Sequence, residues 1–212
     1  MTPSRSARRA IAPWRFWLPL GFQAVLILLL PAQALYTQAV GTPVVLQTAP
    51  VDPYDFLRGY YVTLNYDISI PRNLAELPGW EAIAPAEDPD NPTAALAADT
   101  PIYVVLEPPA GDANRPEGSQ PAPWMPVRVS GDRPTDLTAS QIALRGTYQN
   151  GRILYGLERY YIPEDQRQEI NDRIQAAQQS DNPEAYVVEV KIDSMGRSLP
   201  IRIWVEGEAY RF

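Results

Sequence analysis

Few residue types in this chain could do chemistry, because its 212 residues include no Cys and no His. Thiolate and imidazole groups are therefore excluded as nucleophiles, general bases and metal ligands, and disulfides cannot form. Carboxylates, arginines, hydroxyls and the single lysine, Lys191, remain. The sequence also lacks a glycine-rich phosphate loop, a nucleophile elbow and a metal-binding helix motif. We therefore expect no catalytic residue set, no metal site and no cofactor.

The best chemical candidate in the second half of the chain is the pair Glu158 and Arg159, inside a tyrosine-rich segment that includes Tyr160. A charged pair in this setting could line a ligand groove, because an arginine fork can bind a carboxylate or a phosphate with two hydrogen bonds. The alternative is the polar face of a half-exposed strand whose tyrosines pack inward. At the level of sequence both interpretations stay open.

Lys191 could serve as a general base beside a serine, because a buried lysine loses its charge readily. The segment 186–192 alternates, however, and its even-numbered residues are apolar. This pattern places Lys191 on the opposite, more polar face of a strand, together with Val187 and Glu189. We therefore expect Lys191 to be a solvated cross-strand charge.

A second candidate region is the segment 57–67, which is typical of a strand that begins at a turn at Gly59. Alternation places Leu64 and Tyr66 on one face of this strand and Tyr61 and Asp67 on the other. We expect the face with Leu64 and Tyr66 to pack inward.

This segment resembles the motif of the GDYXXLXY family of membrane-anchored bacterial proteins, which has Gly-Asp-Tyr, two free positions, Leu, one free position and Tyr. Gly59, Tyr61, Leu64 and Tyr66 match the motif, whereas Tyr60 stands where the motif has Asp. Residues 155–164 resemble a second block of the family. The motif and possible binding residues are Gly59, Tyr60, Tyr61, Leu64, Tyr66, Asp67, Glu158, Arg159 and Tyr160.

The resemblance implies an architecture but no chemistry, because the family has no established activity. Tyr60 in place of the Asp weakens a catalytic interpretation of the motif and favours a structural one. Proteins that resemble this chain are often encoded beside multi-pass membrane proteins, which implies a partner of that kind.

The N-terminal region has the features of a membrane anchor. Residues 1–15 contain four arginines and no acid, and no charged residue occurs from Phe16 to Val51. Residues 16–35 form an apolar stretch about long enough to cross a bilayer as a helix. The positive-inside rule then predicts a single-pass protein, with residues 1–15 in the cytoplasm and the body outside. The alternative is a signal peptide cleaved near Ala34, which would release the body to the periplasm.

The body, residues 36–212, is predicted to be an extracytoplasmic β-rich domain with two proline-rich loops at 71–100 and 108–123. Strands are predicted at 42–47, 57–67, 102–107, 124–129, 142–148, 153–161, 186–192, 199–205 and 208–212. Asn150 and Gly151 predict a hairpin turn, and Pro163 opens one amphipathic helix. The fold class is therefore mainly β (α+β): an N-terminal transmembrane helix, then an antiparallel sandwich or barrel-like domain with one late helix.

The distribution of charge along the chain narrows the classes of partner that this protein could bind. The net charge is −7, and because residues 1–50 hold four arginines and no acid, the remainder carries −11. An acidic body repels phosphates, so no nucleic-acid partner is expected. We expect a membrane-anchored accessory or binding domain, a non-catalytic partner of a multi-pass protein in the lipid bilayer.

Two alternatives belong to other classes of function. One is a cell-envelope hydrolase that depends on a serine or on a carboxylate of Asp55, Asp67 or Glu158, whose side chains would then have to converge in a cleft. The other is a peptide- or glycan-binding module that stacks its ligand on Tyr61, Tyr155 and Tyr160, which would require an exposed aromatic patch.

Overall fold

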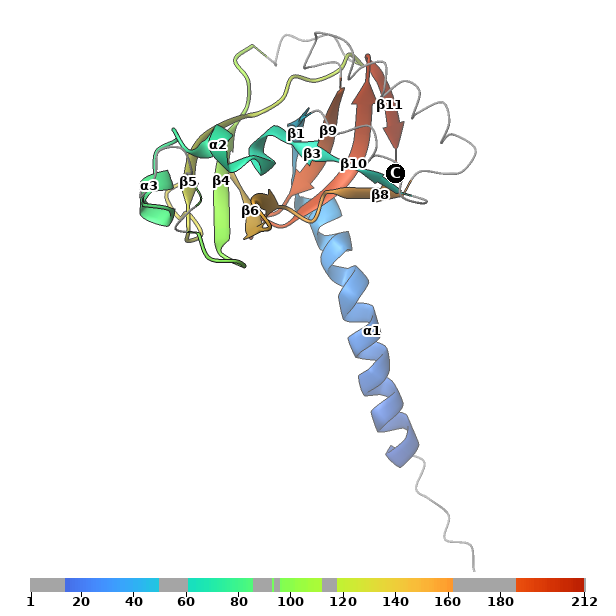
Figure 1. The fold of residues 1–212 in the computed structure, drawn as a ribbon. Coiled ribbons are helices and arrows are strands. Elements are labelled where there is room, and N and C mark those ends of the chain that lie inside the picture. Colours follow the sequence, from blue (N-terminus) through green and yellow to red (C-terminus); the bar gives the residue numbers. More distant parts are fainter. Residues whose placement is uncertain are drawn as a thin grey trace, which may run out of the picture. The chain divides into compact units, whose positions relative to one another are not determined.

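The computed structural model describes residues 14–49, 61–85, 93, 96–111, 118–161 and 186–211 (Figure 1). The chain divides into two compact units, Met1–Tyr36 and Thr37–Phe212. The helix predicted after Pro163 lies outside the described residues, and so do Gly59 and Tyr60.

The first unit contains most of α1 (Trp14–Val40), a helix of 27 residues with Pro19 and Pro31 inside it. Its two segments, Trp14–Leu29 and Pro31–Val40, are bent by 40°. Pro31 explains the bend, because a proline removes one helical hydrogen bond and its ring clashes with the preceding turn. By length and composition, no single unbroken helix in the described part qualifies as a membrane span, whereas these two segments qualify as a bent pair.

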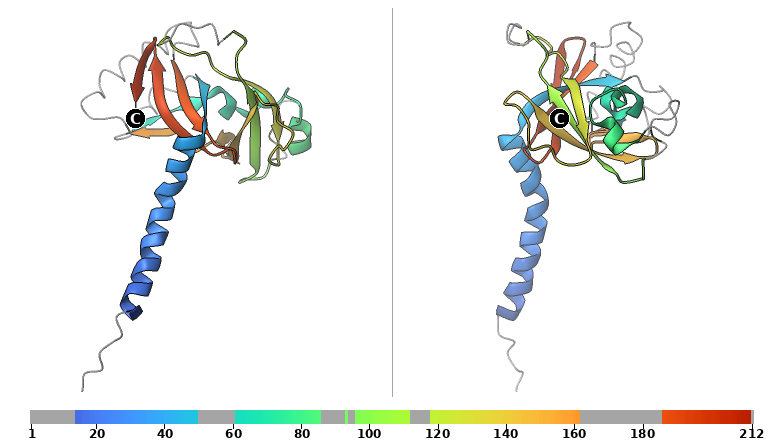
Figure 2. Two further views of the ribbon diagram at one scale, coloured as in Figure 1. Left: turned by 180° about the vertical axis from the view of Figure 1, so that it is seen from behind. Right: turned by 90° about the vertical axis from the view of Figure 1, so that its left-hand side faces the viewer.

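The second unit is rich in antiparallel strands, which confirms the predicted class of the body. A five-stranded sheet has the order β11-β10-β9-β1-β3, a four-stranded sheet has the order β5-β4-β6-β7, and β2 pairs with β8. Figure 2 shows the two larger sheets from behind and from the side. The strands are β1 (Thr42–Ala49), β2 (Tyr61–Thr63), β3 (Asn65–Tyr66), β4 (Pro101–Glu107), β5 (Met125–Ser130), β6 (Ile142–Gln149), β7 (Arg152–Leu154), β8 (Arg159–Tyr161), β9 (Tyr186–Ile192), β10 (Ser198–Val205) and β11 (Glu208–Arg211).

Three turns join neighbouring antiparallel strands of the body. Asn150 and Gly151 join β6 to β7 with φ values of 51° and 79°, the pair of positive angles of a type I′ turn. Gly196 lies in the turn between β9 and β10, and Glu206 with Gly207 joins β10 to β11. The predicted hairpin turn at Asn150 and Gly151 is therefore confirmed.

The predicted strand 57–67 is wrong in its continuity. The backbone leaves the strand at Leu64, whose N–H donates to the carbonyl of Glu158 at 2.9 Å. As a result β2 pairs with β8, whereas β3 pairs with β1. The chain then enters a short 3-10 turn, η1 (Asp67–Ser69). After Leu64 the chain changes its pairing partner from β8, about 90 residues away along the sequence, to β1, and local alternation cannot predict this change.

The predicted strand 153–161 is also interrupted. It ends at Leu154 and resumes as β8, because Gly156 takes a φ of 75° that extended backbone does not allow. The described part of the loop predicted at 71–100 contains two short helices, α2 (Pro71–Leu74) and α3 (Trp80–Ile83). Pro71 begins α2 as its first residue, where its missing N–H breaks no helical hydrogen bond.

The two larger sheets share one hydrophobic core. Leu46 and Val188 enter it from the five-stranded sheet, and Val104 and Leu144 from the four-stranded sheet. The motif residues Leu64 and Tyr66 belong to the same core, and both are 0% exposed. The predicted inward face of the motif segment is therefore confirmed for these two residues.

A smaller cluster lies on the opposite face of β9. It consists of Val45, Val187 and Trp204, with Trp124 packed against it. Val187 thus lies on the predicted face, opposite Val188, but it is 0% exposed, so this end of the face is covered and not polar as expected. The backbone N–H of Trp124 donates to the carbonyl of Val45 at 2.8 Å, which brings the segment before β5 over this side of the sheet.

Candidate functional site

The two segments that resemble the family blocks meet in space. β2 and β8 pair antiparallel, so that Tyr61 lies opposite Tyr161, Val62 opposite Tyr160, and Thr63 opposite Arg159. The hydrogen bond from Leu64 N–H to the Glu158 carbonyl continues this contact. The first block is therefore built directly on the second.

Two buried tyrosine hydroxyls cross-link the blocks in opposite directions. Tyr66 of the first block donates to the carbonyl of Leu157 at 2.8 Å. Tyr155 of the second donates to the carbonyl of Ile68 at 2.7 Å. Burial, and then the nearby carboxylate of Glu158, raise the pKa of Tyr155 well above its usual value. Tyr155 therefore stays neutral and keeps its proton for this bond.

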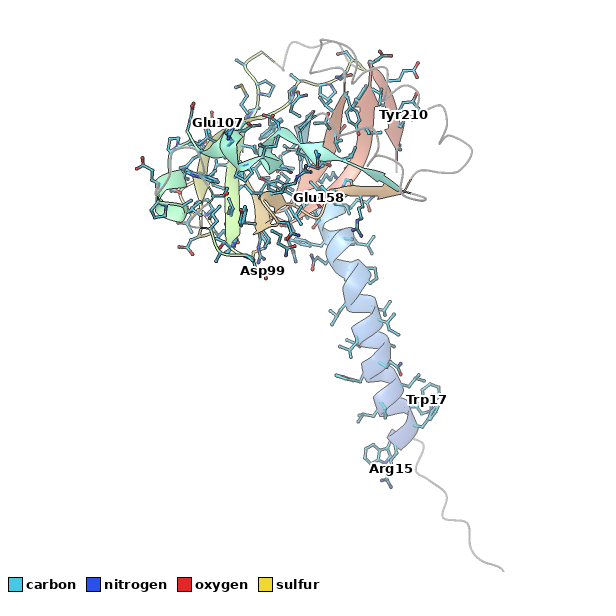
Figure 3. All side chains as sticks on the ribbon, in the orientation of Figure 1. Arg15, Trp17, Asp99, Glu107, Glu158 and Tyr210 are labelled. Atoms are coloured by element: carbon cyan, nitrogen blue, oxygen red, sulfur yellow. The ribbon has the colours of Figure 1, made fainter. Side chains whose placement is uncertain are left out.

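Glu158 is held in place by the second block itself. Its Oε1 accepts a hydrogen bond from the backbone N–H of Tyr155 at 2.5 Å, and its side chain is half-buried. The side chain of Glu158 is labelled in Figure 3. The carboxylate thus has a fixed orientation before any ligand is bound.

A cleft of about 410 Å³ opens beside this junction. It is lined by Asn65, Ser69, Arg152, Leu154, Gly156, Glu158 and Arg159. Asn65 belongs to β3 and Arg152 to β7, which are the last strands of the five-stranded and four-stranded sheets. The cleft therefore lies between two sheet edges, with the second block forming part of its wall.

The polar groups of the cleft have a defined arrangement. Arg152 Nη1 donates to Asn65 Oδ1 at 2.5 Å, which connects the two sheet edges. Ser69 is 3% exposed, and its hydroxyl has no hydrogen-bond partner within the described part of the chain. A buried unsatisfied hydroxyl costs about 1–3 kcal/mol. The cleft thus combines two arginines and one carboxylate with a hydroxyl that lacks a partner.

The predicted site residues fall into three groups. Glu158 and Arg159 line the cleft, whereas Leu64 and Tyr66 are buried in the core below it. Asp67 is exposed, accepts a hydrogen bond from Asn73 Nδ2 at 2.7 Å and does not line the cleft.

Four predicted positions are described in part or not at all. Tyr61 and Tyr160 are placed by their backbone in β2 and β8, and Gly59 and Tyr60 lie outside the described residues.

Sequence reasoning missed Asn65, Ser69, Arg152, Leu154 and Gly156 as site residues. Asn65 had a usable signal, because it occupies the last free position of the motif, between the packed Leu64 and Tyr66. Arg152 and Ser69 had none, because their place in the cleft depends on how the two sheets meet.

Three sequence interpretations can be compared with the geometry. Lys191 does not line the cleft; its Nζ donates to the carbonyl of Gln38 at 2.5 Å, and its side chain is half-buried. Of the three carboxylates considered for a hydrolase, Glu158 lies in the cleft, Asp67 does not, and Asp55 is outside the described residues. Tyr155 is buried, so its predicted role in a stacking surface is wrong.

The fold and the cleft define a β-rich protein whose polar cleft lies between two sheet edges. The chain belongs to the GDYXXLXY protein family, whose sequence model matches residues 23–203. No curated protein and no solved structure shows a significant match to the chain.

Proposed function

We propose that this protein is a membrane-anchored, extracytoplasmic binding domain that acts as a non-catalytic accessory subunit of a membrane protein complex. The observation that carries the proposal is the exposed apolar surface of α1. Trp17, Phe22 and Leu28 are each 65% exposed on this helix. Apolar surface in water costs about 25 cal/mol per Å², so a run of such side chains requires an apolar medium.

The dimensions of α1 support a bilayer as that medium. Its 27 residues rise about 40 Å, more than the hydrocarbon thickness of about 30 Å, so a bend and a tilt are accommodated. Arg5, Arg8 and Arg9 precede the helix and Arg15 lies in its first turn, and no further arginine follows before Arg58. The positive-inside rule then favours a cytoplasmic N-terminus and an extracytoplasmic domain.

Anchoring is tested by extracting membranes from cells that express the full chain. We expect the protein to stay in the pellet at alkaline pH and to leave it in detergent. Leu26→Arg, near the middle of α1, should shift the protein to the soluble fraction, because a central arginine costs about 2.5–3.5 kcal/mol of insertion. Ser140→Arg, on the exposed surface of the domain, should not. Alkaline release of the unmodified chain would contradict an anchor.

Orientation is tested with the cysteine-free background that the sequence provides. A membrane-impermeant maleimide should label Ser140→Cys in intact cells and should label Ser6→Cys only after permeabilisation. The opposite labelling pattern would reverse the proposed topology. The intact mass of the extracted protein separates a retained anchor from a leader cleaved near Ala34.

Partnership is tested by purification from a mild detergent. We expect a multi-pass membrane protein to co-purify with the chain. Repeated recovery of the chain alone would contradict the role as a subunit and would leave anchoring unaffected.

The cleft favours binding over hydrolysis. The hydrolase alternative required several carboxylates to converge, and among the described residues that line the cleft Glu158 is the one that is acidic. Its Oε1 is already engaged by the backbone of Tyr155. A fixed carboxylate beside two arginines is better suited to orienting a polar ligand than to transferring protons.

A further inference from the structure

We infer that the cleft binds the carboxyl-terminal end of an extended peptide, with the terminal carboxylate at Arg152 and Arg159. This inference rests on the proposed binding function and names the class of its ligand. The combination of charge, edge geometry and an unpartnered hydroxyl carries it.

The charges of the lining select a carboxylate. Two arginines face the cleft within a body whose sequence is strongly acidic, so the cleft is a local site for an anion. Guanidinium groups bind carboxylates and phosphates in a similar planar geometry. Glu158 favours a carboxylate ligand over a phosphate ligand, because its fixed negative charge repels a phosphate dianion more than a single carboxylate.

Glu158 also gives the site a direction. Its Oε1 accepts the N–H of Tyr155, and a carboxylate has further acceptor positions on its second oxygen. A peptide carries N–H donors one or more bonds away from its terminal carboxylate. A ligand with its carboxylate at the arginines can therefore place a backbone N–H at Glu158.

The two sheet edges favour an extended ligand. β3 and β7 each end a sheet, and residues of both line the cleft. An edge strand presents backbone groups that a further strand can pair with. β7 has three residues and β3 has two, so the edges match only the last few residues of a peptide. Leu154 adds an apolar wall against which a ligand side chain can pack.

Ser69 supplies the observation that is independent of charge. Its hydroxyl is buried, lines the cleft and lacks a hydrogen-bond partner within the described part of the chain. Buried polar groups in folded proteins nearly always have a partner. A peptide amide or carboxylate oxygen is a suitable one, because a hydroxyl can donate and accept.

The test uses the full chain in a mild detergent and two tripeptide libraries of identical composition, one with free carboxyl termini and one with terminal amides. Native mass spectrometry measures retention. We expect the free-acid library to be retained and the amide library to be retained at least about tenfold less, because the amide removes the charge that the arginines bind. Equal retention of both libraries, or of neither, would overturn the inference.

Variants place the binding in the cleft. Arg159→Gln and Arg152→Gln should each weaken retention of the free-acid library about tenfold, and Ser69→Ala should weaken it by a smaller factor. Arg72→Gln is the matched control, since Arg72 is exposed in α2 and does not line the cleft. Circular dichroism confirms that each variant is folded. Unchanged retention in folded Arg152→Gln and Arg159→Gln variants would also overturn the inference.

Inorganic phosphate separates failure of the inference from failure of the proposed function. We expect a tenfold molar excess of phosphate over the library to leave free-acid retention unchanged. If phosphate displaces the library, the site prefers phosphate, so the peptide assignment falls while a binding function stands. The proposed anchoring and partnership are judged by extraction and co-purification, which do not depend on this ligand.

Discussion

Tyr66 and Tyr155 have the same structural role on opposite sides of the junction between the two blocks, because each donates a buried hydroxyl hydrogen bond across it. The Tyr66 hydroxyl donates to the Leu157 carbonyl of the second block, the Tyr155 hydroxyl donates to the carbonyl of Ile68 directly after the first block, and both side chains are buried. Packing in the core thus explains the Leu of the motif, and packing together with one hydrogen bond explains its last Tyr. The free position between them, Asn65, lines the cleft. In this chain the fixed letters of the motif therefore support the wall of the cleft, whereas a position that the motif leaves free lines the cleft itself.

Removal of the Tyr66 hydroxyl tests this role. Tyr66→Phe should lower the free energy of unfolding by about 1–3 kcal/mol, because it leaves the Leu157 carbonyl buried without its partner. Tyr103→Phe is the matched control, since Tyr103 is a half-buried residue of β4 at which the change should stay within about 0.5 kcal/mol. Urea unfolding of the full chain in detergent measures both. Equal effects of the two substitutions would contradict the cross-link.

Asp193 gives a second residue-scale prediction, on pH. Burial alone would raise the pKa of Asp193. The effect of burial is outweighed by hydrogen bonds that the carboxylate accepts. The donors are the backbone N–H and the guanidinium of Arg197, the N–H of Met195 and the hydroxyl of Thr37, and together they hold the pKa of Asp193 below its usual value of 3.8. The folded state therefore binds this proton less readily than the unfolded state. The resulting stability is fully present well above pH 3.8 and is lost as pH falls through the lowered pKa.

We expect Asp193→Asn to reduce both the stability of the chain at neutral pH and its loss of stability in acid. The unfolding free energies of the unmodified chain and the variant should converge as the pH falls below 3.8. Urea unfolding across a pH series measures this difference, with Asp132→Asn on the exposed surface as a control. A difference that does not change with pH would show that the charge of Asp193 is not responsible.

At the scale of elements, the hairpins could be predicted and the junction could not. The turn at Asn150 and Gly151 is encoded by two adjacent residues, so its strands follow from local chemistry. The break at Leu64 is different, because it depends on the carbonyl of Glu158. Alternation correctly placed Leu64 in the core but could not reveal that β2 and β3 join different sheets. Glu158 and Arg159 could be predicted as a site because they are adjacent in the sequence. Arg152 could not, because its place beside them depends on contacts between distant segments.

Gly146 tests how tightly β6 and β7 pack against the second block. A Cβ at this position would lie 2.5 Å from Ile153 Cγ2 and 2.8 Å from Tyr155 Cε1. Gly146→Ala should therefore destabilise the chain by about 1–3 kcal/mol through overpacking. Gly131→Ala is the control, since its nearest contact would be Ile83 Cγ1 at 3.8 Å. Thermal unfolding of the two variants gives the comparison, and equal midpoints would argue against tight packing at Tyr155.

At the scale of the whole molecule, two properties of the sequence have separate consequences. The apolar α1 accounts for the proposed anchor, and the acidic body makes the two arginines of the cleft a local exception in charge. Composition and length could predict the first property. The second required the fold, because Arg152 and Arg159 come together with Asn65 and Ser69 only after the two sheets have formed.

The most direct test of the central claim is hydrogen–deuterium exchange of the full chain in detergent, with and without the free-acid tripeptide library. A ligand in the cleft should slow exchange in the lining segments 65–69 and 152–159. Exchange at the other end of the five-stranded sheet, in β11, should stay unchanged. Slower exchange in β11 with no change in the lining segments would contradict the assignment of the cleft as the binding site.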